Sequence, residues 1–536
     1  MQVPTHLTIA AIVREWARCD PDRPALIFEG ADIRPDVIRT YGDLWRNAQA
    51  FAQGFRQNGI GTGDVIATLM ANHAEFVELM VACAISGSVL VPIDPRTRGE
   101  KLRFMLHNSG AIALVAADYA LPQVLDTLSE LEGLRWIAAL PTDEGMARSE
   151  WPDSILETST LMLRTPEELP VEGVDPDSAM EILFTSGTTG DPKGIVMTHR
   201  RYCETSLLAR GLFGYTDQDR LYSGLSLTHA NAQLVTLGAA LCAGLLAVFS
   251  RRFTKTRLWD ITRRYQCTTF TLLGGMTTAV YAEPMKPDDA DNPVRFVVSA
   301  GMPAAIWKEF ESRFNVHVVE FYGSAEGGLS VKPANAGPAG SIGKVAPAFI
   351  HRIINEDGSD ATIGMSGELL FRYRDGRPFV VEYVGNTEAS AMKCKDGWLW
   401  MGDIVHQDAQ GWLFFDFRKG GGIRRNGDFV NTAFVEKAIA ESGLIDDVYV
   451  YGVKGVSGAP GEKDVVAAVV PLDAASFDPQ KLFAICRAKL EANFVPSYVQ
   501  VLAQIPKTAS EKPQDRFLIE AFGNNPEQVH TERKSA

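Results

Sequence analysis

The sequence has few cysteines and none at the spacings that bind metals. Its seven cysteines stand at positions 19, 83, 203, 242, 267, 394 and 486, without a Cys-x-x-Cys pair or a Cys/His cluster of zinc spacing. This pattern predicts scattered core thiols in a reducing compartment. A chain of 536 residues needs no disulfide or metal site to be stable, because its length suggests about three or four folding units with hydrophobic cores of their own.

The chain also has fewer basic than acidic residues. Lys and Arg number 52 against 66 Asp and Glu, which gives a net charge of −14. A phosphate backbone recruits positive charge, so a generally basic nucleic-acid binder is disfavoured and we expect no nucleic-acid partner. Local basic pockets for a nucleotide are compatible with this balance.

No apolar run has the length of a membrane span. The longest uncharged apolar stretch, Leu234–Phe249, is shorter than the roughly 18–20 residues required, and we expect a buried helix followed by a strand there. The first 25 residues lack a basic stretch followed by an apolar one, so no targeting segment is expected. These absences predict a cytoplasmic protein without a transmembrane segment.

Helical patterns alternate with short apolar runs along most of the chain. Helices are expected at residues 41–58, 75–86 and 101–108, and strands at residues 64–70, 89–93, 111–116, 182–184, 220–225, 245–249, 269–272, 296–299 and 316–321. Strands that alternate with helices imply parallel sheets with crossover connections. The predicted fold class is therefore α/β, with a large N-terminal domain of parallel sheets in αβαβα layers.

The pattern changes after residue 340. Shorter strands with Asp-Gly turns predict a β-rich subdomain at about residues 341–419, within an N-terminal domain of residues 1–419. Gly420, Gly421 and Gly422 are the strongest boundary signal, because consecutive glycines maximise backbone freedom; a hinge and a tight turn fit them equally well. Residues 420–536 are expected to form a small α+β domain, with residues 524–536 as a frayed tail.

The segment Phe184–Gly194 carries the sharpest chemical signal. Its sequence, FTSGTTGDPKG, follows an apolar strand and combines hydroxyl side chains, glycines and Lys193. Glycines let backbone N–H groups close on an anion, hydroxyls donate further hydrogen bonds, and lysine adds charge, so a phosphate-binding loop is predicted. It is not a Walker A loop, because Lys193 is followed by Gly194.

This loop and the motifs that follow it resemble the adenylate-forming superfamily of acyl-CoA synthetases, firefly luciferase and peptide-synthetase adenylation domains. The later motifs, in the expected order, are Tyr322–Glu326, Trp398–Asp403, Arg418–Val430 and Pro506–Lys512. The resemblance covers nearly the whole chain. It implies ATP, Mg²⁺ and coenzyme A as cofactors, and a mobile C-terminal domain that carries a catalytic lysine.

The resemblance also implies the residues that bind ATP and AMP. Tyr322 would stack on adenine, Asp403 would accept both ribose hydroxyls, and Arg418 would donate to ribose or phosphate. Lys512 would place positive charge where the carboxylate meets the α-phosphate. The implied set is Thr185, Ser186, Gly187, Thr188, Thr189, Gly190, Lys193, Ala300, Gly301, Met302, Glu320, Phe321, Tyr322, Gly323, Ser324, Ala325, Asp403, Arg418 and Lys512.

The implied catalytic residues are Lys512, Glu326, Thr185 and His229. Thr185 and Glu326 are also the implied metal residues, since Mg²⁺ prefers carboxylate and phosphate oxygens. His229 resembles the family residue that lines the acyl pocket and moves aside for the thiol of CoA. Its assignment as a general base stays open.

The implied acyl pocket comprises His229, Asn231, Gln233, Gly275, Met276, Ser299, Gly301 and Gly327. The paired glycines at Gly274–Gly275 and Gly327–Gly328 remove side chains and predict room for a branched, cyclic or extended acid. No charged residue among them would hold a second charge. The residues implied on the CoA side are Arg424, Arg425 and Gly427, and the hinge is implied at Gly420 and Gly421.

The sequence departs from the family pattern at four places. Ala325 replaces a threonine, which removes a phosphate-side hydroxyl. Gly420 and Gly421 stand where a Lys-Asp pair is common, Arg424 replaces a lysine, and Glu511 replaces the glycine before the catalytic lysine. None of these departures removes a core role.

The predicted function is an AMP-forming acyl-CoA synthetase, an acid–thiol ligase that joins a small-molecule carboxylic acid to CoA. The alternatives are a free-standing acyl-AMP ligase, which Ala325 suits, and a nucleotide-binding regulatory protein without turnover. An amino-acid activator is disfavoured, because the segment Ala230–Gln233 has no acid to hold an ammonium group. The Glu511-Lys512 variant and Val495–Tyr498 faintly resemble the carnitine and crotonobetaine–CoA ligase branch. A homodimer is left open as the assembly.

Overall fold

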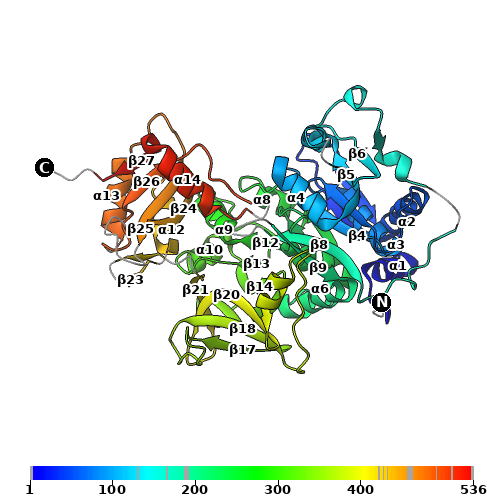
Figure 1. The fold of residues 1–536 in the computed structure, drawn as a ribbon. Coiled ribbons are helices and arrows are strands. Elements are labelled where there is room, and N and C mark those ends of the chain that lie inside the picture. Colours follow the sequence, from blue (N-terminus) through cyan, green and yellow to red (C-terminus); the bar gives the residue numbers. More distant parts are fainter. Residues whose placement is uncertain are drawn as a thin grey trace. The chain divides into compact units, whose positions relative to one another are not determined.

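The structure is a computed structural model whose chain forms two compact units (Figure 1). It describes all residues except 1–3, 129–130, 132, 164–166, 186–191, 420–422, 426–427, 431, 455–462, 491, 509–510 and 533–536. The first unit comprises Met1–Thr254, Thr262–Thr271 and Val380–Lys393. The second comprises Lys255–Ile261, Leu272–Phe379 and Cys394–Ala536.

Three helices near the N-terminus pack together in the first unit (Figure 1): α1 (Ile9–Cys19), α2 (Tyr41–Gln57) and α3 (Ala74–Ser86). Side-chain caps start two of them. The Thr8 hydroxyl accepts from Ala11 N before α1, and Thr40 and Asp43 form a reciprocal capping box at α2. These ends confirm the predicted helices at residues 41–58 and 75–86.

A seven-stranded sheet in the first unit confirms the predicted parallel arrangement. Neighbouring strands are parallel except for the last pair, β8 and β9, which form an antiparallel hairpin. Helix α4 (Gly99–Ser109) buries Leu102, Met105 and Leu106 in the core that this sheet shares. The strand order is β7 (Ile155–Glu157), β6 (Trp136–Leu140), β5 (Ala111–Ala117), β3 (Val65–Leu69), β4 (Val89–Ile93), β8 (Ala179–Thr185) and β9 (Lys193–Thr198).

A second run of strands in the first unit is also mainly parallel. Its order is β12 (Thr269–Leu273), β10 (Arg220–Ser223), β11 (Leu246–Phe249), β1 (Pro24–Phe28) and β2 (Val37–Thr40), and only β1 and β2 are antiparallel. Between β10 and β11 the chain forms a π-helix (Ala232–Gly238) and α7 (Ala239–Ala243). The expected helix and strand at Leu234–Phe249 are confirmed. The sequence did not indicate the π-helical winding.

The second unit contains the expected β-rich region. Strands β13 (Phe296–Ala300) and β14 (His317–Ser324) are parallel, and antiparallel pairing follows through β15 (Gly327–Lys332), β16 (Ser341–Val345), β21 (Leu413–Arg418), β20 (Trp398–Gln407), β18 (Gly367–Tyr373) and β17 (Phe349–Ile354). The short β19 (Cys394–Lys395) pairs with β20. Helices α9 (Gly274–Ala282) and α10 (Trp307–Phe314) precede β13 and β14 respectively.

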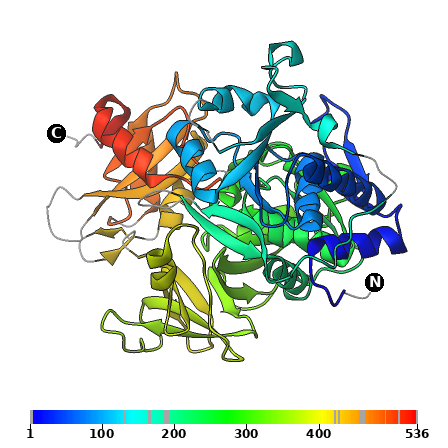
Figure 2. The same cartoon turned by 45° about the vertical axis from the view of Figure 1, so that its right-hand side comes forward.

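The C-terminal part of the second unit is a four-stranded sheet with helices on both faces (Figure 2). Helices α12 (Thr432–Ala440) and α13 (Pro479–Lys489) share a buried core with one face of the sheet. Leu518 of α14 (Asp515–Asn524) packs against Tyr451 and Val466 on the other face. The strand order is β24 (Ile445–Lys454), β25 (Lys463–Pro471), β26 (Tyr498–Val501) and β27 (Val529–Thr531).

The prediction of a frayed tail at residues 524–536 was wrong for residues 524–532, and residues 533–536 lie outside the described residues. Strand β27 pairs antiparallel with β26, with Gln500 opposite Val529. The Gln480 side chain donates to the carbonyl oxygen of Thr531 (2.9 Å), and Arg487 forms an ion pair with Glu532. The segment is too short and too polar to reveal a strand by its pattern, and its conformation depends on pairing with the edge of β26 and on these side-chain contacts. In the part of the chain that is described, no helix has the length and apolar character of a membrane span.

Truncation of the chain after Asn525 should lower its stability. Loss of β27 leaves the edge of β26 unpaired and exposes the buried Gln500, and each lost hydrogen bond is worth about 1 kcal/mol. We expect the free energy of unfolding to fall by about 1–3 kcal/mol in denaturant titrations. A control that lacks only residues 533–536 should match the full chain. Equal midpoints for both truncations would show that the strand contributes nothing.

Candidate active site

A buried carboxylate joins three strands of the second unit. Asp403 on β20 is 4% exposed and lies opposite Arg418 on β21 in the strand register. Arg418 Nη1 donates to Asp403 Oδ1 (3.0 Å), and the Tyr322 hydroxyl on β14 donates to Oδ2 (2.5 Å). Burial raises the pKa of Tyr322 well above its usual value and the Asp403 charge adds to the effect, so the hydroxyl keeps its proton. The structure thus brings three implied nucleotide residues together.

A second buried acid shapes the loop that follows β13. Glu320 Oε1 accepts from Gly301 N (2.5 Å), and Oε2 accepts from Met302 N (3.2 Å). Gly301 has φ +102°, a conformation that favours glycine. Burial raises the pKa of Glu320 to about 8, although these N–H groups and the nearby Lys332 oppose the shift. Glu320 therefore holds the loop of Ala300, Gly301 and Met302 in place.

The hairpin between β14 and β15 carries the implied metal-side acid. Ser324 pairs with Gly327 and donates to its carbonyl oxygen (3.1 Å), which leaves Ala325 and Glu326 at the turn. The open space predicted beside Gly327 is absent, because a Cβ there would lie 2.7 Å from the Phe379 ring. Gly327 has φ +132°, so its backbone and the aromatic packing both favour glycine. The other members of this segment, Phe321 and Gly323, lie within β14.

Lys512 lies on a tight loop in the second unit. Thr508 N donates to the Lys512 carbonyl oxygen (2.8 Å), and Lys512 N donates to the Thr508 hydroxyl (3.2 Å). Glu511 has φ +58°, which explains why glycine suits this position and indicates local strain in this chain. Burial lowers the pKa of Lys512 and the Arg418 charge adds to this, while Asp403 and Asp515 oppose it. Lys512 is therefore close enough to interact electrostatically with Asp403 and Arg418.

Two glycine segments meet beside the lysine loop. A Cβ on Gly275 would lie 3.7 Å from the Glu511 carbonyl oxygen, which is ordinary contact distance. A Cβ on Gly301 would lie 3.3 Å from the Cα of Gly274, so the ends of β12 and β13 adjoin. Met276 and Ser299 are buried next to these glycines in the chain. The second-unit members of the implied acyl pocket thus border the implied nucleotide residues.

The phosphate-loop candidates belong to the first unit. Thr185 ends β8 and pairs with Lys193 at the start of β9, and its hydroxyl donates to the Lys193 carbonyl oxygen (3.4 Å). The Lys193 amine lies 5.2 Å from the centroid of the Tyr383 ring. Ser186, Gly187, Thr188, Thr189 and Gly190 lie outside the described residues. The structure therefore places both ends of the predicted loop in one hairpin.

His229, Asn231 and Gln233 lie on one turn of the first unit. His229 Nδ1 accepts from Asn231 N (3.2 Å), and Gln233 N donates to the His229 carbonyl oxygen (3.2 Å). A nitrogen that accepts a hydrogen bond carries no proton, so this bond assigns the proton of the neutral ring to Nε2. His229 is thereby arranged as a hydrogen-bond donor through Nε2.

Glu181 is a buried acid that the sequence analysis did not single out. It lies on β8, four residues before Thr185, and is 0% exposed. Burial raises its pKa to about 8, and the Gln233 side chain partly opposes the shift. The Tyr202 hydroxyl of α6 (His199–Phe213) donates to the Gln233 carbonyl oxygen (3.1 Å). An acid inside the apolar run Met180–Leu183 was the available signal.

The residues implied for CoA and the hinge are only partly described. Arg425 Nη1 donates to the carbonyl oxygens of Val495 (2.5 Å) and Asn493 (3.3 Å) within the C-terminal part. The backbone of Arg424 pairs with Phe429 in β22 (Arg424–Arg425) and β23 (Asp428–Phe429). Gly427 and the hinge residues Gly420 and Gly421 lie outside the described residues.

The chemistry of these side chains fits a nucleotide and a hard cation. A buried carboxylate, an aromatic ring and a guanidinium suit ribose hydroxyls, adenine and phosphate respectively. Within the described residues, no group of three His, Cys, Asp or Glu could hold a metal ion. Mg²⁺ usually takes one or two carboxylates and completes its shell with water and phosphate oxygens, so the oxygen donors of Thr185 and Glu326 suit it.

Comparison with family models shows which protein family the chain belongs to. The sequence model of the AMP-binding enzyme family matches residues 13–375, and that of the AMP-binding enzyme C-terminal domain matches residues 435–512. The chain belongs to the AMP-binding enzyme family. The predicted adenylate-forming superfamily and the predicted class of acid–thiol ligases are thereby confirmed.

Several proteins resemble this AMP-binding enzyme over nearly its full length. Long-chain fatty acid transport protein 1 of Mus musculus is 28% identical over 97% of this chain and 83% of its own. Crotonobetaine/carnitine–CoA ligase of Salmonella paratyphi B is 27% identical over 92% of this chain and 95% of its own. The resemblance to the carnitine-ligase branch is therefore supported, and the fatty acid transport protein is a relative that the sequence analysis did not anticipate.

Solved structures confirm the fold class. An anthranilate CoA ligase in complex with anthranoyl-AMP has a TM-score of 0.82 and 20% identity, and the match covers 98% of this chain and 100% of that one. A benzoate CoA ligase from Burkholderia xenovorans LB400 has a TM-score of 0.78 and 21% identity, with 95% and 99% coverage. At these identities the likeness establishes the α/β fold of the AMP-binding enzyme.

Replacement of Glu181 by glutamine should change how stability depends on pH. In the wild type the folded state retains the Glu181 proton up to about pH 8, whereas the unfolded chain releases it near pH 4.5. The free energy of unfolding therefore falls as pH rises between these values, by up to about 1.4 kcal/mol per pH unit for this group. Glu181→Gln removes this loss while it preserves the shape of the side chain.

Denaturant titrations from pH 5 to pH 9 would measure the effect. We expect the stability of Glu181→Gln relative to wild type to grow up to about pH 8 and then to level off. Glu320, whose pKa is also raised to about 8, titrates in both proteins and cancels in the difference. A constant difference across the range would contradict the raised pKa.

Proposed function

We propose that this AMP-binding enzyme is an ATP-dependent acyl-CoA synthetase with a two-step reaction. The observation that carries the proposal is the convergence of Tyr322, Asp403, Arg418 and Lys512 in the second unit. Hydroxyl, carboxylate and cationic groups there match the needs of an adenylate. The CoA ligases among the relatives support the same reaction class.

In the first step a carboxylate oxygen of the acid attacks the α-phosphorus of ATP. A new P–O bond forms, the bond to the bridging oxygen breaks, and pyrophosphate leaves with its electron pair. Lys512 would stabilise the negative charge that develops between the two anions. Burial lowers the pKa of Lys512 and the nearby Arg418 charge adds to this, and bound anions would act against both effects.

Asp403 and Glu320 would orient the nucleotide for this step. Asp403 would exchange its hydrogen bond with Tyr322 for the ribose hydroxyls and thereby free the ring to lie on adenine. Glu320 would keep the Gly301–Met302 loop in the shape that borders the adenine. Such fixed positioning lowers the entropic cost of bringing two substrates together.

The phosphates would bind at the hairpin of the first unit. Lys193 and the hydroxyls of the segment Thr185–Gly190 would grip the triphosphate. Thr185 and Glu326 would hold Mg²⁺, which when bound neutralises phosphate charge.

In the second step the thiolate of CoA attacks the acyl carbon, and AMP leaves as the mixed anhydride bond breaks. Activation is needed because a free carboxylate is a poor electrophile. Residues 420–536 would act as the mobile domain, with Gly420 and Gly421 as hinge and Arg424, Arg425 and Gly427 on the CoA side. His229 would line the acyl pocket and donate through Nε2 to the substrate, since its Nδ1 is occupied.

The proposed substrate is a carboxylic acid without a second negative charge. The described acyl-pocket candidates include no Asp, Glu, Lys or Arg. A side-chain carbon at Gly275 would only reach ordinary contact distance from the Glu511 carbonyl oxygen, so the glycine leaves space beside the lysine loop. The carnitine-type relatives suggest a branched or betaine-like acid, and the fatty acid transport relative suggests a longer one. A free-standing acyl-AMP ligase is the alternative, favoured by Ala325.

Pyrophosphate release from MgATP with a panel of acids tests the proposed reaction. We expect release to require one class of acid and to yield AMP and an acyl-CoA when CoA is present. Short betaine-like, aromatic and long-chain acids should be compared at equal concentration. Stable acyl-AMP with no CoA dependence would instead establish the acyl-AMP ligase. No release with any acid, although ATP binds, would contradict both.

Lys512→Ala should separate the two steps. We expect adenylate formation to slow by about 10²–10³-fold, the scale for loss of one electrostatic stabiliser, and thioester formation from supplied acyl-AMP to change little. Single-turnover assays of each half-reaction would measure the split. Lys507→Ala is the matched control, because that lysine pairs with Asp447 (2.6 Å) in the same motif. Equal losses in both steps would contradict the role given to Lys512.

A further inference from the structure

A buried asparagine in the first unit bridges three backbone groups near the histidine turn. Asn72 lies between β3 and α3 and is 2% exposed. Its Nδ2 donates to the carbonyl oxygens of Leu225 (2.8 Å) and Ser250 (2.8 Å), and its Oδ1 accepts from Leu227 N (2.8 Å). The amide thus uses both donor hydrogens and its oxygen on backbone far away in the sequence.

Two of these three backbone groups lie in the chain segment that leads directly to His229. Leu225 and Leu227 belong to the connection that follows β10, and His229 N donates to the Ser226 carbonyl oxygen (3.0 Å) within it. Ser250 immediately follows β11, the parallel neighbour of β10. Asn72 therefore ties the ends of two adjacent strands to each other, one of which leads into the histidine turn. The position of His229 depends on the connection that Asn72 holds.

The residues on either side of Asn72 are held as well. The Tyr119 hydroxyl accepts a hydrogen bond from Ala71 N (2.8 Å) and forms another hydrogen bond with His73 Nε2 (3.0 Å). Burial lowers the pKa of His73 to about 3, with the charges of Arg251 and Arg34 adding to the effect. The ring is therefore neutral, and it shares one hydrogen bond with the Tyr119 hydroxyl. One hydroxyl thus fixes the backbone before and the side chain after Asn72.

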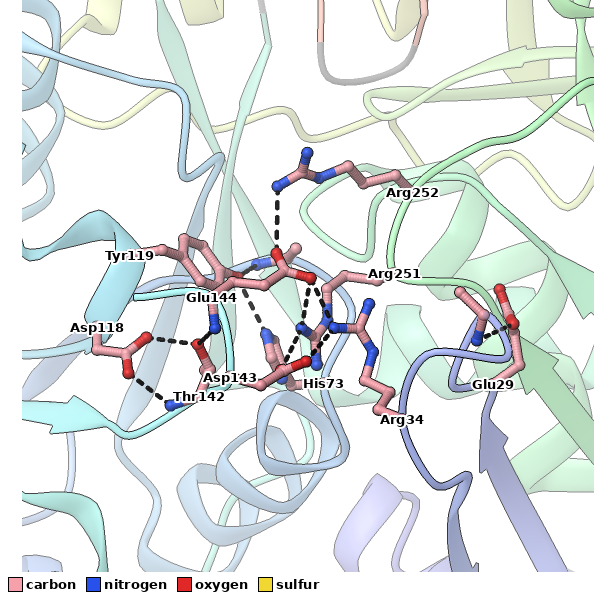
Figure 3. A network of polar contacts seen from close by, with 12 residues as sticks. Glu29, Arg34, His73, Asp118, Tyr119, Thr142, Asp143, Glu144, Arg251 and Arg252 are labelled. Carbon is pink, nitrogen blue, oxygen red and sulfur yellow. Dashed lines mark hydrogen bonds and ion pairs between the residues drawn. The ribbon is translucent and has the colours of Figure 1, made fainter. Parts of the chain in front are cut away.

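A network of ion pairs supports Tyr119 and the end of β11 together (Figure 3). Asp143 and Glu144 accept from Arg34 (2.6 Å each) and from Arg251 (3.1 and 3.0 Å), and Arg251 follows Ser250 in the chain. The backbone N–H of Thr142 donates to Asp118 (2.6 Å), the residue before Tyr119. Figure 3 shows these acids facing the arginines beside the Tyr119–His73 pair.

We propose that Asn72 is a positioning residue for His229: its amide holds the connection after β10 so that His229 Nε2 meets the acyl substrate. This inference rests on the proposed acyl-CoA synthetase function. A side chain in this place must supply two donors and one acceptor at once, which asparagine does. Aspartate has the same shape but no donor, and its charge would face two carbonyl oxygens.

A double-mutant cycle between Asn72 and His229 tests the proposal. Asn72→Asp and Asn72→Ser should each reduce kcat/KM for the acid by about 10–100-fold, because misplacement by about 1 Å costs that much. Binding of ATP measured alone should change less than twofold. In a His229→Ala background the same Asn72 substitutions should have little further effect on kcat/KM, since they act through the missing ring.

The matched control is Gln49→Glu. Gln49 is also a buried amide that bridges backbone, since it donates to the Leu169 carbonyl oxygen (3.0 Å) and accepts from Leu169 N (2.8 Å). Its loss should lower the thermal midpoint without any coupling to His229. Tyr119→Phe is a milder variant that leaves Asn72 intact but removes its support, and it should show the same coupling to His229 with a smaller loss.

The outcomes separate this inference from the proposed function. Additive losses for Asn72 and His229, with folded and active single variants, would overturn the positioning role. If Asn72→Asp does not fold, Asn72→Ser and Tyr119→Phe provide the cycle, and additivity in both would overturn it equally. An inactive wild type across the acid panel would instead contradict the proposed function and leave no activity for the cycle to measure.

Discussion

Burial of charged or titratable oxygen atoms is the constraint on which this structure depends most. A carboxylate removed from water requires hydrogen-bond donors or a proton, and each buried acid here meets that requirement in its own way. Asp403 receives donors from Tyr322 and Arg418, and Glu320 receives backbone N–H groups. Glu181 lies beside the Gln233 amide and its pKa is raised to about 8. These requirements determine which strands must lie next to each other.

The need to give buried carboxylates hydrogen-bond donors also explains why the segments around the proposed nucleotide site are held in fixed positions. Partners of Asp403 come from two other strands, and a ribose that replaced Tyr322 would find the carboxylate already oriented. Backbone geometry adds a further demand at Gly301 and Glu511, both at positive φ. Glycine meets it without strain, whereas Glu511 does not. The replacement of the family's glycine by Glu511 therefore strains the backbone as well as adding a negative charge.

Local chemistry allowed much of the fold and several site residues to be predicted. The apolar runs that became β3, β4 and β5 are short and are separated by helical periods, so their type and order could be predicted. The motifs around Tyr322, Asp403 and Lys512 are specific because their spacing is tied to strand ends and turns. The π-helix after His229 was not predictable, since π and α winding share residue preferences. The pairing of β27 was missed because a three-residue strand has no period to read.

The order of motifs by itself determined the superfamily, the α/β class and the residues to examine, because these depend on local composition and spacing. Only the tertiary structure decided what each buried polar group contacts. Glu320 supports a loop 19 residues away, Asn72 reaches backbone more than 150 residues away, and the space beside Gly327 is filled by Phe379. Such contacts join segments that are remote in the chain, and hydrogen-bond satisfaction and close packing select them only when the whole domain folds.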